Sequence, residues 1–160
     1  MEVRVAGDAR IDVLKNNDGY SRAVAAVAIG EGEVLAPFGA RETLATPNYL
    51  TVQTGPETHI LLSPEHLQYI NHSCDPNVFF DTTRMEIVAL RDIPAGEEVR
   101  FFYPSTEWTM DRAFDCLCGS SACIGRIAGA DQLDADALQR NAFNQHILDR
   151  LAERLAVLAD

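Results

Sequence analysis

Short apolar runs separated by turn-forming residues fill most of the chain before residue 105. Apolar residues alternate with polar ones at Val3/Val5 and Ile11/Val13, and Asn16-Asn17-Asp18-Gly19 then marks a turn. Val78–Phe80 and Met85–Leu90 flank a polar connection and predict a hairpin. Many short strands at regular spacing predict a mostly-β fold with short helices. The expected strands are residues 3–5, 11–13, 23–29, 34–35, 49–53, 59–62, 78–80, 85–90 and 99–103.

The pattern changes after Gly129, where apolar residues recur at helical spacing. This spacing predicts a C-terminal amphipathic helix, with Asp134 as its N-cap. We expect the helix to pack on its own domain, and dimerisation is the alternative. A second, shorter helix is expected after Ser63-Pro64, with Ser63 as its cap. The apolar positions of the long helix are Leu138, Phe143, Ile147, Leu148, Leu151, Leu155 and Leu158.

Length and composition indicate one domain, since 160 residues that are 47% hydrophobic suffice for one core. The sequence has neither a run of the ~18 apolar residues that span a membrane nor a secretion signal. We therefore expect a soluble, intracellular protein without membrane contact. The formal charge of −11 argues against direct binding to nucleic acid. An acidic surface suits a cationic ligand, although it serves solubility equally well.

The four cysteines have spacing that favours a metal site. Cys116, Cys118 and Cys123 form C-x-C-x4-C, and the chain's remaining cysteine is Cys74. Three thiolates on one turn supply three corners of a tetrahedron, and structural zinc requires four ligands. Cys74 is the expected fourth ligand. The alternatives are a three-cysteine site completed by His72, unrelated free thiols, and a redox pair, although redox pairs favour C-x-x-C.

Three motifs in the same order resemble those of SET-domain lysine methyltransferases. Asn71-His72-Ser73-Cys74 resembles the Asn-His-Ser-Cys motif of that family, and Gly96–Tyr103 resembles its strand ending in a catalytic tyrosine. The C-terminal cysteines resemble the post-SET segment, whose cysteines bind zinc together with the cysteine of Asn-His-Ser-Cys. The resemblance spans roughly residues 19–126. It implies a SET-like domain over residues 1–112, a post-SET zinc segment over 113–130 and a packed helix over 131–160.

The resemblance also implies the residues of the site. The expected fold is a SET-type β-fold with knot-like threading, and S-adenosylmethionine is the expected methyl donor. Asn71 and His72 would hold the adenosine part of the donor, and Leu117 would cover its adenine ring. Tyr103 would lie at the methyl-transfer pore, and Tyr49 would line the substrate channel or belong to the core. Zinc would be structural.

Two departures from the family pattern affect these expectations. The Gly-x-Gly segment that approaches the cofactor in the family falls here on Tyr20-Ser21-Arg22. These side chains would crowd the cofactor, or Arg22 would bind its carboxylate. In addition, Phe102 stands where the family commonly has an aspartate.

The expected reaction is methyl transfer to an amine, with a protein lysine as the first expectation. The chain has no long inserted substrate-recognition region, so a peptide or a small amine remains open as a substrate. Two alternatives are a SET-like binding module without transferase activity and an enzyme that modifies small molecules. The amine must first lose a proton that free lysine holds with a pKa near ~10.4. Burial beside a sulfonium lowers that pKa.

Overall fold

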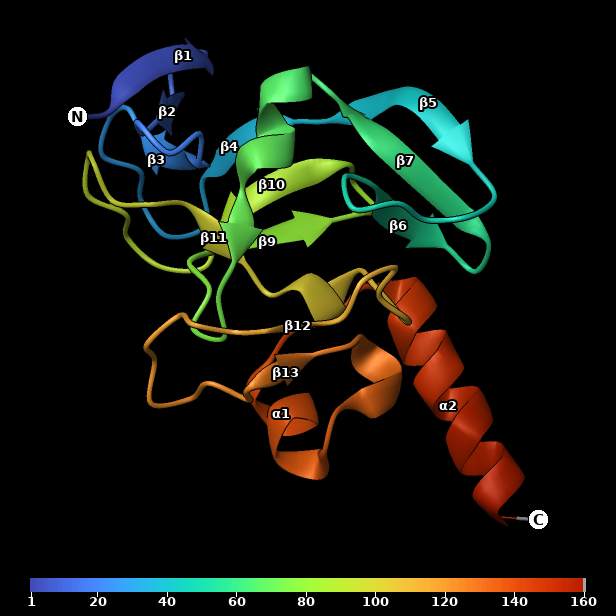
Figure 1. The fold of residues 1–160 in the computed structure, drawn as a ribbon. Coiled ribbons are helices and arrows are strands. Elements are labelled where there is room, and N and C mark those ends of the chain that lie inside the picture. The colour runs from blue at the N-terminus through green and yellow to red at the C-terminus, as the bar shows by residue number, and fades with distance from the viewer. Residues whose placement is uncertain (160) are drawn as a thin grey trace.

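The computed structural model describes residues 1–159, and short, mostly antiparallel strands make up most of their regular secondary structure (Figure 1). Three three-stranded sheets have the orders β1-β2-β3, β4-β10-β9 and β5-β7-β6. Their strands are β1 (Val3–Gly7), β2 (Ile11–Lys15), β3 (Ser21–Ala25), β4 (Val34–Pro37), β5 (Gly39–Leu44), β6 (Val52–Gly55), β7 (Thr58–Ser63), β9 (Val78–Asp81) and β10 (Glu86–Ala89). The mostly-β prediction is confirmed.

Two further strand pairs and five helical segments complete the described chain. The parallel pair is β8 (Asn71–His72) with β11 (Arg100–Phe101), and the antiparallel pair is β12 (Phe114–Asp115) with β13 (Arg126–Ile127). The 3₁₀ helices are η1 (Glu65–Tyr69), η2 (Tyr103–Ser105) and η3 (Ala130–Gln132), and the α-helices are α1 (Ala135–Arg140) and α2 (Gln145–Ala159). Within residues 1–159, no helix combines the length and the apolar character needed to cross a bilayer.

The core lies between the sheets, where the inward-facing residues of each strand meet. In β2 the alternation is direct, because Ile11 and Val13 are fully buried while their neighbours are partly exposed. Phe80 of β9 is at the centre, with ring centroids 4.2 Å from Phe101 and 5.5 Å from Phe38. The core therefore supports β11, the strand that leads to Tyr103.

Backbone pairing brings two distant motifs side by side. Arg100 of β11 is in register with Asn71 of β8, and Phe101 is in register with His72. Asn77, in the turn after β8, forms hydrogen bonds to the backbone in and before β11. Its amide donates to the Glu98 carbonyl at 2.8 Å, and its Oδ1 accepts from the Arg100 N–H at 2.9 Å. The segment that carries Cys74 is thus held against β11, the strand that leads to Tyr103.

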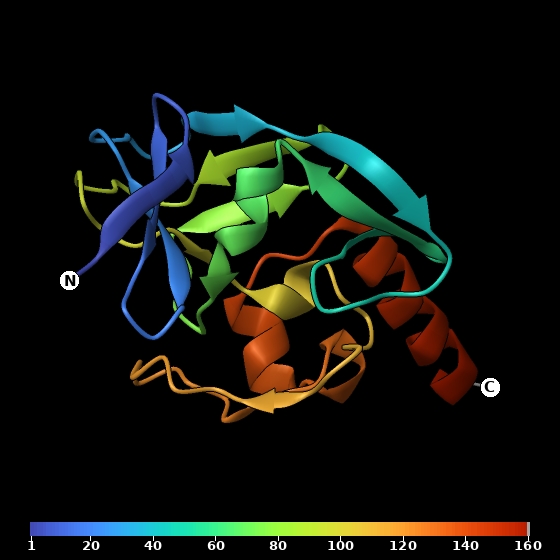
Figure 2. The same ribbon diagram turned by 45° about the horizontal axis from the view of Figure 1, so that its top comes forward.

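The C-terminal helix is interrupted, unlike the single helix that the spacing predicted. Asp134 does cap α1, since its side chain accepts from the Ala137 N–H. The interruption precedes α2 at Asn144, whose side-chain amide donates to the carbonyls of Phe80 at 2.7 Å and Ser105 at 3.0 Å. These tertiary bonds hold Asn144 in place between the two helices. Ile147 is buried at the start of α2, which extends away from the strands toward its C-terminal end (Figure 2).

The other short helix also differs in detail. Pro64, and not Ser63, is the residue preceding η1, and no side chain caps the helix. Ser63 instead ends β7. The structure also contains β5, which the apolar pattern did not predict because four of its six residues are exposed.

Candidate metal centre and active site

The fold brings the four cysteines to one point. Their Sγ atoms all lie within 4.8 Å of one another, and those of Cys74 and Cys116 are 3.8 Å apart. Four sulfurs at 2.3 Å from a tetrahedral zinc ion are about 3.8 Å apart. The donor set and its spacing therefore fit zinc. His72 is not among the clustered ligands, although its Nε2 lies 3.3 Å from the Cys74 sulfur.

Local turns shape the segment that carries the three C-terminal cysteines. Cys116 donates its N–H to the Gly125 carbonyl at 2.6 Å, which closes a loop at the end of β12 and β13. Gly119 and Gly125 have positive φ, at +75° and +82°, which residues with a Cβ adopt with strain. The N–H of Ile124 points to the Cys74 sulfur at 3.5 Å. These contacts point sulfurs from both ends of the loop toward Cys74.

His72 connects this cluster to the strand of Tyr103. Its Nδ1 accepts the Tyr103 N–H at 3.1 Å, so the proton of the neutral ring lies on Nε2, facing the Cys74 sulfur. Burial, with a smaller effect of the Arg100 charge, lowers the pKa of His72 to about 4. The imidazole is therefore neutral at pH 7 and serves as a hydrogen-bonding link between Tyr103 and Cys74.

A cavity beside the cysteines, here called the cysteine-side cavity, contains most of the predicted cofactor residues. Tyr20, Asn71, His72 and Leu117 all line it, and Leu117 is 95% exposed. The Asn71 amide donates to the Tyr20 hydroxyl at 3.0 Å and to the Ser21 carbonyl at 3.2 Å. The segment in place of Gly-x-Gly therefore forms part of the wall of this cavity.

Arg22 does not line this cavity. Its guanidinium binds both carboxylate oxygens of Glu2 at 2.7 Å and lies 3.8 Å from Glu98. Arg100 does line the cavity, as does Phe114. The sequence analysis named neither residue as part of this site.

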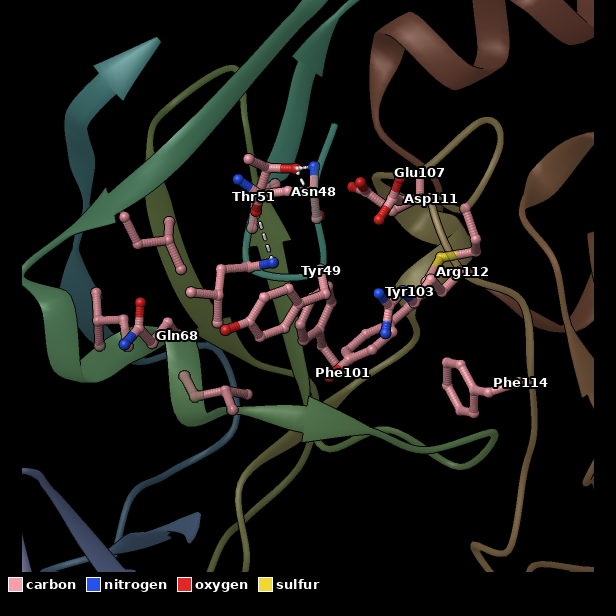
Figure 3. Close-up of a pocket in the computed structure, with 16 residues that line it drawn as sticks. Asn48, Tyr49, Thr51, Gln68, Phe101, Tyr103, Glu107, Asp111, Arg112 and Phe114 are labelled. Atoms are coloured by element: carbon pink, nitrogen blue, oxygen red, sulfur yellow. Dashed lines mark hydrogen bonds between the residues drawn. The ribbon is translucent and has the colours of Figure 1, made fainter. Parts of the chain in front are cut away.

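A second cavity, here called the aromatic cavity, also has Tyr103 in its wall (Figure 3). It encloses about 230 Å³, and its wall includes Tyr49, Phe101, Tyr103 and Phe114. Tyr49 is 77% exposed and lies at the wall rather than in the core. Tyr103 and Phe114 line both cavities, with ring centroids 5.9 Å apart. The two cavities therefore meet at this pair of rings.

Burial shifts the pKa of two acidic groups in the wall of the aromatic cavity. It raises the pKa of Tyr103, aided by the nearby charges of Tyr20 and Glu107, so the hydroxyl stays protonated. Burial also raises the pKa of Glu107 to about 7. A phenol that cannot ionise at neutral pH can orient a substrate but cannot take its proton.

Comparison with known proteins identifies the family. The SET-domain family model matches residues 40–104. Methyltransferase flvH of Aspergillus flavus is 38% identical over 152 residues, which cover 93% of this chain and 85% of flvH. The chain belongs to the SET-domain methyltransferase family. The SET-type fold inferred from the three motifs is therefore confirmed.

Other SET-domain relatives are much longer than this chain. A histone-lysine N-methyltransferase specific for H3 lysine 36, from Mycosarcoma maydis, is 36% identical over 77 residues, which cover 44% of this chain and 8% of the relative. Among solved structures, KRYPTONITE in complex with mCHG DNA and SAH has a TM-score of 0.55 and 21% identity, covering 70% of this chain and 27% of KRYPTONITE. The chain thus matches only a small part of the length of these proteins, the part that has the shared fold.

Proposed function

We propose that this SET-domain protein transfers a methyl group from S-adenosylmethionine to an amine. The observation that carries the proposal is that Tyr103 and Phe114 line two cavities at once. A methyl donor on one side and an acceptor on the other would then meet between these rings. Such a displacement depends mainly on positioning and electrostatics. Tyr103, one of the two shared rings, packs against the hydrophobic core, which would hold it in position.

The cysteine-side cavity has the chemistry of the proposed cofactor site. When bound there, S-adenosylmethionine supplies an electrophilic methyl group on a sulfonium. Asn71 and Tyr20 offer hydrogen bonds, Leu117 offers an apolar surface, and Arg100 offers a cation for a carboxylate. A SET-fold neighbour, KRYPTONITE, is described in complex with SAH. Arg100, whose Nε lies 3.2 Å from the Glu98 carboxylate, replaces Arg22 as the proposed carboxylate contact, because Arg100 lines this cavity and Arg22 does not.

Zinc is proposed as a structural ion held by Cys74, Cys116, Cys118 and Cys123. The ion would join the loop after β12 to the segment after β8. That loop begins beside Phe114 and contains Leu117, and both residues line the cysteine-side cavity. Metal binding would therefore complete one wall of the cofactor site.

The proposed acceptor is a protein lysine side chain. Support comes from relatives named for histone-lysine methylation and from a KRYPTONITE complex that contains an H3(1–15) peptide. A small amine is the second candidate, because the connection between β5 and β6 spans only residues 45–51 and offers little surface to grip a peptide. The strongly negative charge supports a cationic acceptor and no direct contact with nucleic acid.

Two measurements test this function. Calorimetry should show that S-adenosylhomocysteine binds the wild type. Arg100→Ala should weaken this affinity about tenfold or more. Arg84→Ala should leave the affinity unchanged, since Arg84 is on the exposed turn between β9 and β10. Methyl-labelled S-adenosylmethionine should then label n-butylamine, an H3(1–15) peptide or a protein of a cell lysate. If the protein does not bind the cofactor at millimolar concentration, the methyltransferase proposal is refuted and a SET-like binding module without transferase activity remains.

A further inference from the structure

Glu107 is a buried carboxyl in the wall of the aromatic cavity (Figure 3). It follows the short helix η2 that begins at Tyr103, and its N–H donates to the Tyr103 carbonyl at 3.0 Å. One carboxylate oxygen, Oε2, accepts from the Gln53 N–H at 2.8 Å and from the Thr106 hydroxyl at 2.7 Å. Buried carboxylates are rare unless paired, so this side chain calls for an explanation.

The charged groups around Glu107 do not neutralise it. Asp111 and Arg112 also line the aromatic cavity, but both are exposed to solvent. Two histidines lie behind the wall: His59 is paired with Gln53 across β6 and β7, and the His146 ring bonds the Thr106 carbonyl at 2.7 Å. Burial lowers the pKa of both histidines, which keeps them neutral at pH 7.

The remaining basic groups near this segment face outward. Arg150 and Arg154 of α2 stack on the Trp108 ring, at 5.0 and 4.8 Å from its centroid. The pKa of Glu107 is raised by burial, and the two hydrogen bonds to Oε2 only partly offset that effect. No hydrogen bond from another residue of the 1–159 range reaches its Oε1.

We propose that the Glu107 carboxylate accepts the proton that the substrate ammonium must lose before methyl transfer. This inference rests on the proposed function. In the step, an N–H bond of the ammonium breaks and an O–H bond forms on Glu107. The freed nitrogen lone pair then forms the N–C bond as the C–S bond of the sulfonium breaks. Glu107 returns its proton to water through the mouth of the cavity.

Two opposing pKa shifts favour this transfer. Desolvation makes a carboxylate a stronger base and an ammonium a stronger acid, and a neighbouring sulfonium acidifies the ammonium further. In a dry cavity, the neutral pair of carboxylic acid and amine therefore competes well with the ion pair. Tyr103 cannot take this role because its hydroxyl is already protonated. Tyr49 and Asp111 are exposed to solvent, so neither is a base sheltered from water inside the cavity.

The expected effect of removing the carboxylate follows from the chemistry of the amine. At pH 7 an amine with a pKa of ~10.4 is neutral in roughly one molecule in 10³. Glu107→Gln keeps an oxygen for the Gln53 N–H but loses the base. The variant must use the neutral fraction, so kcat/KM at pH 7 should fall about 10²–10³-fold. The loss should shrink about tenfold per pH unit as pH rises toward 10.

The test measures kcat/KM for methyl transfer from pH 6 to 10. The acceptor is the one that the wild type labels: n-butylamine, the H3(1–15) peptide or a protein of the lysate. The wild type should rise to a plateau with a midpoint near 7, and Glu107→Gln should keep rising to pH 10. Glu57→Gln, an exposed carboxyl on the β6–β7 turn, should follow the wild type. Cofactor affinity by calorimetry should be equal in all three proteins.

Parallel profiles for the wild type and Glu107→Gln would overturn the inference while leaving the methyltransferase proposal intact. A wild-type profile that rises to pH 10 without a plateau would also overturn it, even if the variant does not fold. Wild-type protein that labels no acceptor would overturn the proposed function itself, and this inference with it.

Discussion

Removing the proposed zinc ion should unfold one segment and empty the proposed cofactor site together. The perturbation is dialysis against a chelator, with Cys118→Ser as the genetic counterpart. The segment at risk is 116–125, the loop between β12 and β13. It buries little apolar surface of its own, since Leu117 is 95% exposed.

The magnitude follows from what holds this loop. Ordering about ten residues costs about 10–20 kcal/mol in backbone entropy. The hydrogen bonds within the loop and from Ile124 to the Cys74 sulfur return about 5 kcal/mol in total. A structural zinc ion contributes about 10–16 kcal/mol, which makes up the difference. Without it, the loop should be disordered.

Hydrogen exchange measures the order of the loop, and calorimetry measures the affinity for the cofactor product. After chelation, the amides of Cys116 and Cys123 should exchange rapidly, while Ile87 and Phe80 in the core stay protected. Affinity for S-adenosylhomocysteine should fall at least about 100-fold, because Cys116, Leu117 and Cys118 leave the cavity wall. Protected loop amides and unchanged affinity in metal-free, reduced protein would refute the reasoning.

Three further predictions concern single residues. Tyr103→Phe should reduce transfer about 10²–10³-fold while zinc content and cofactor affinity stay the same, because only the orienting hydroxyl is lost; unchanged turnover would exclude that role. Gly129→Ala should cost at least about 3 kcal/mol in denaturant unfolding, since a Cβ at φ +118° would lie 2.8 Å from Thr109 Cα. Gly96→Ala, at φ +90° with nothing within 4 Å, should cost about 1 kcal/mol; equal losses would contradict the clash. Because the pKa of Glu107 is raised from 4.5 to about 7, its contribution to stability should be present below pH 4.5 and lost by about 3 kcal/mol as pH rises to 7. Urea unfolding from pH 4.5 to 8 should show this decline in the wild type and not in Glu107→Gln.

Local patterns predicted the elements whose formation depends on local chemistry. The alternation in β2 and the β9–β10 hairpin were readable because burial on one face of a strand imposes a period of two. The C-x-C-x4-C spacing predicted a ligand cluster, and the structure places Cys74 beside it. By contrast, β5 has a mostly polar, exposed sequence and carries no such signal.

Features that depend on contacts between residues far apart in the chain could not be predicted from the sequence. The break before α2 depends on Asn144 binding the Phe80 and Ser105 carbonyls, which lie far from it in sequence. Ser105, Thr106 and Glu107 are polar residues without an apolar pattern, yet all three are buried. Arg22 was expected to contact the cofactor, but its guanidinium pairs with Glu2. Nothing in the sequence alone indicated that the N-terminal residue Glu2 lies beside Arg22.

A crystal structure with S-adenosylhomocysteine tests the central claim most directly. The ligand should fill the cysteine-side cavity, with its carboxylate at Arg100, its adenine against Leu117 and its sulfur facing Tyr103 and Phe114. An ordered ligand elsewhere, or a Tyr20 side chain that keeps this cavity closed at saturating ligand, would contradict the account.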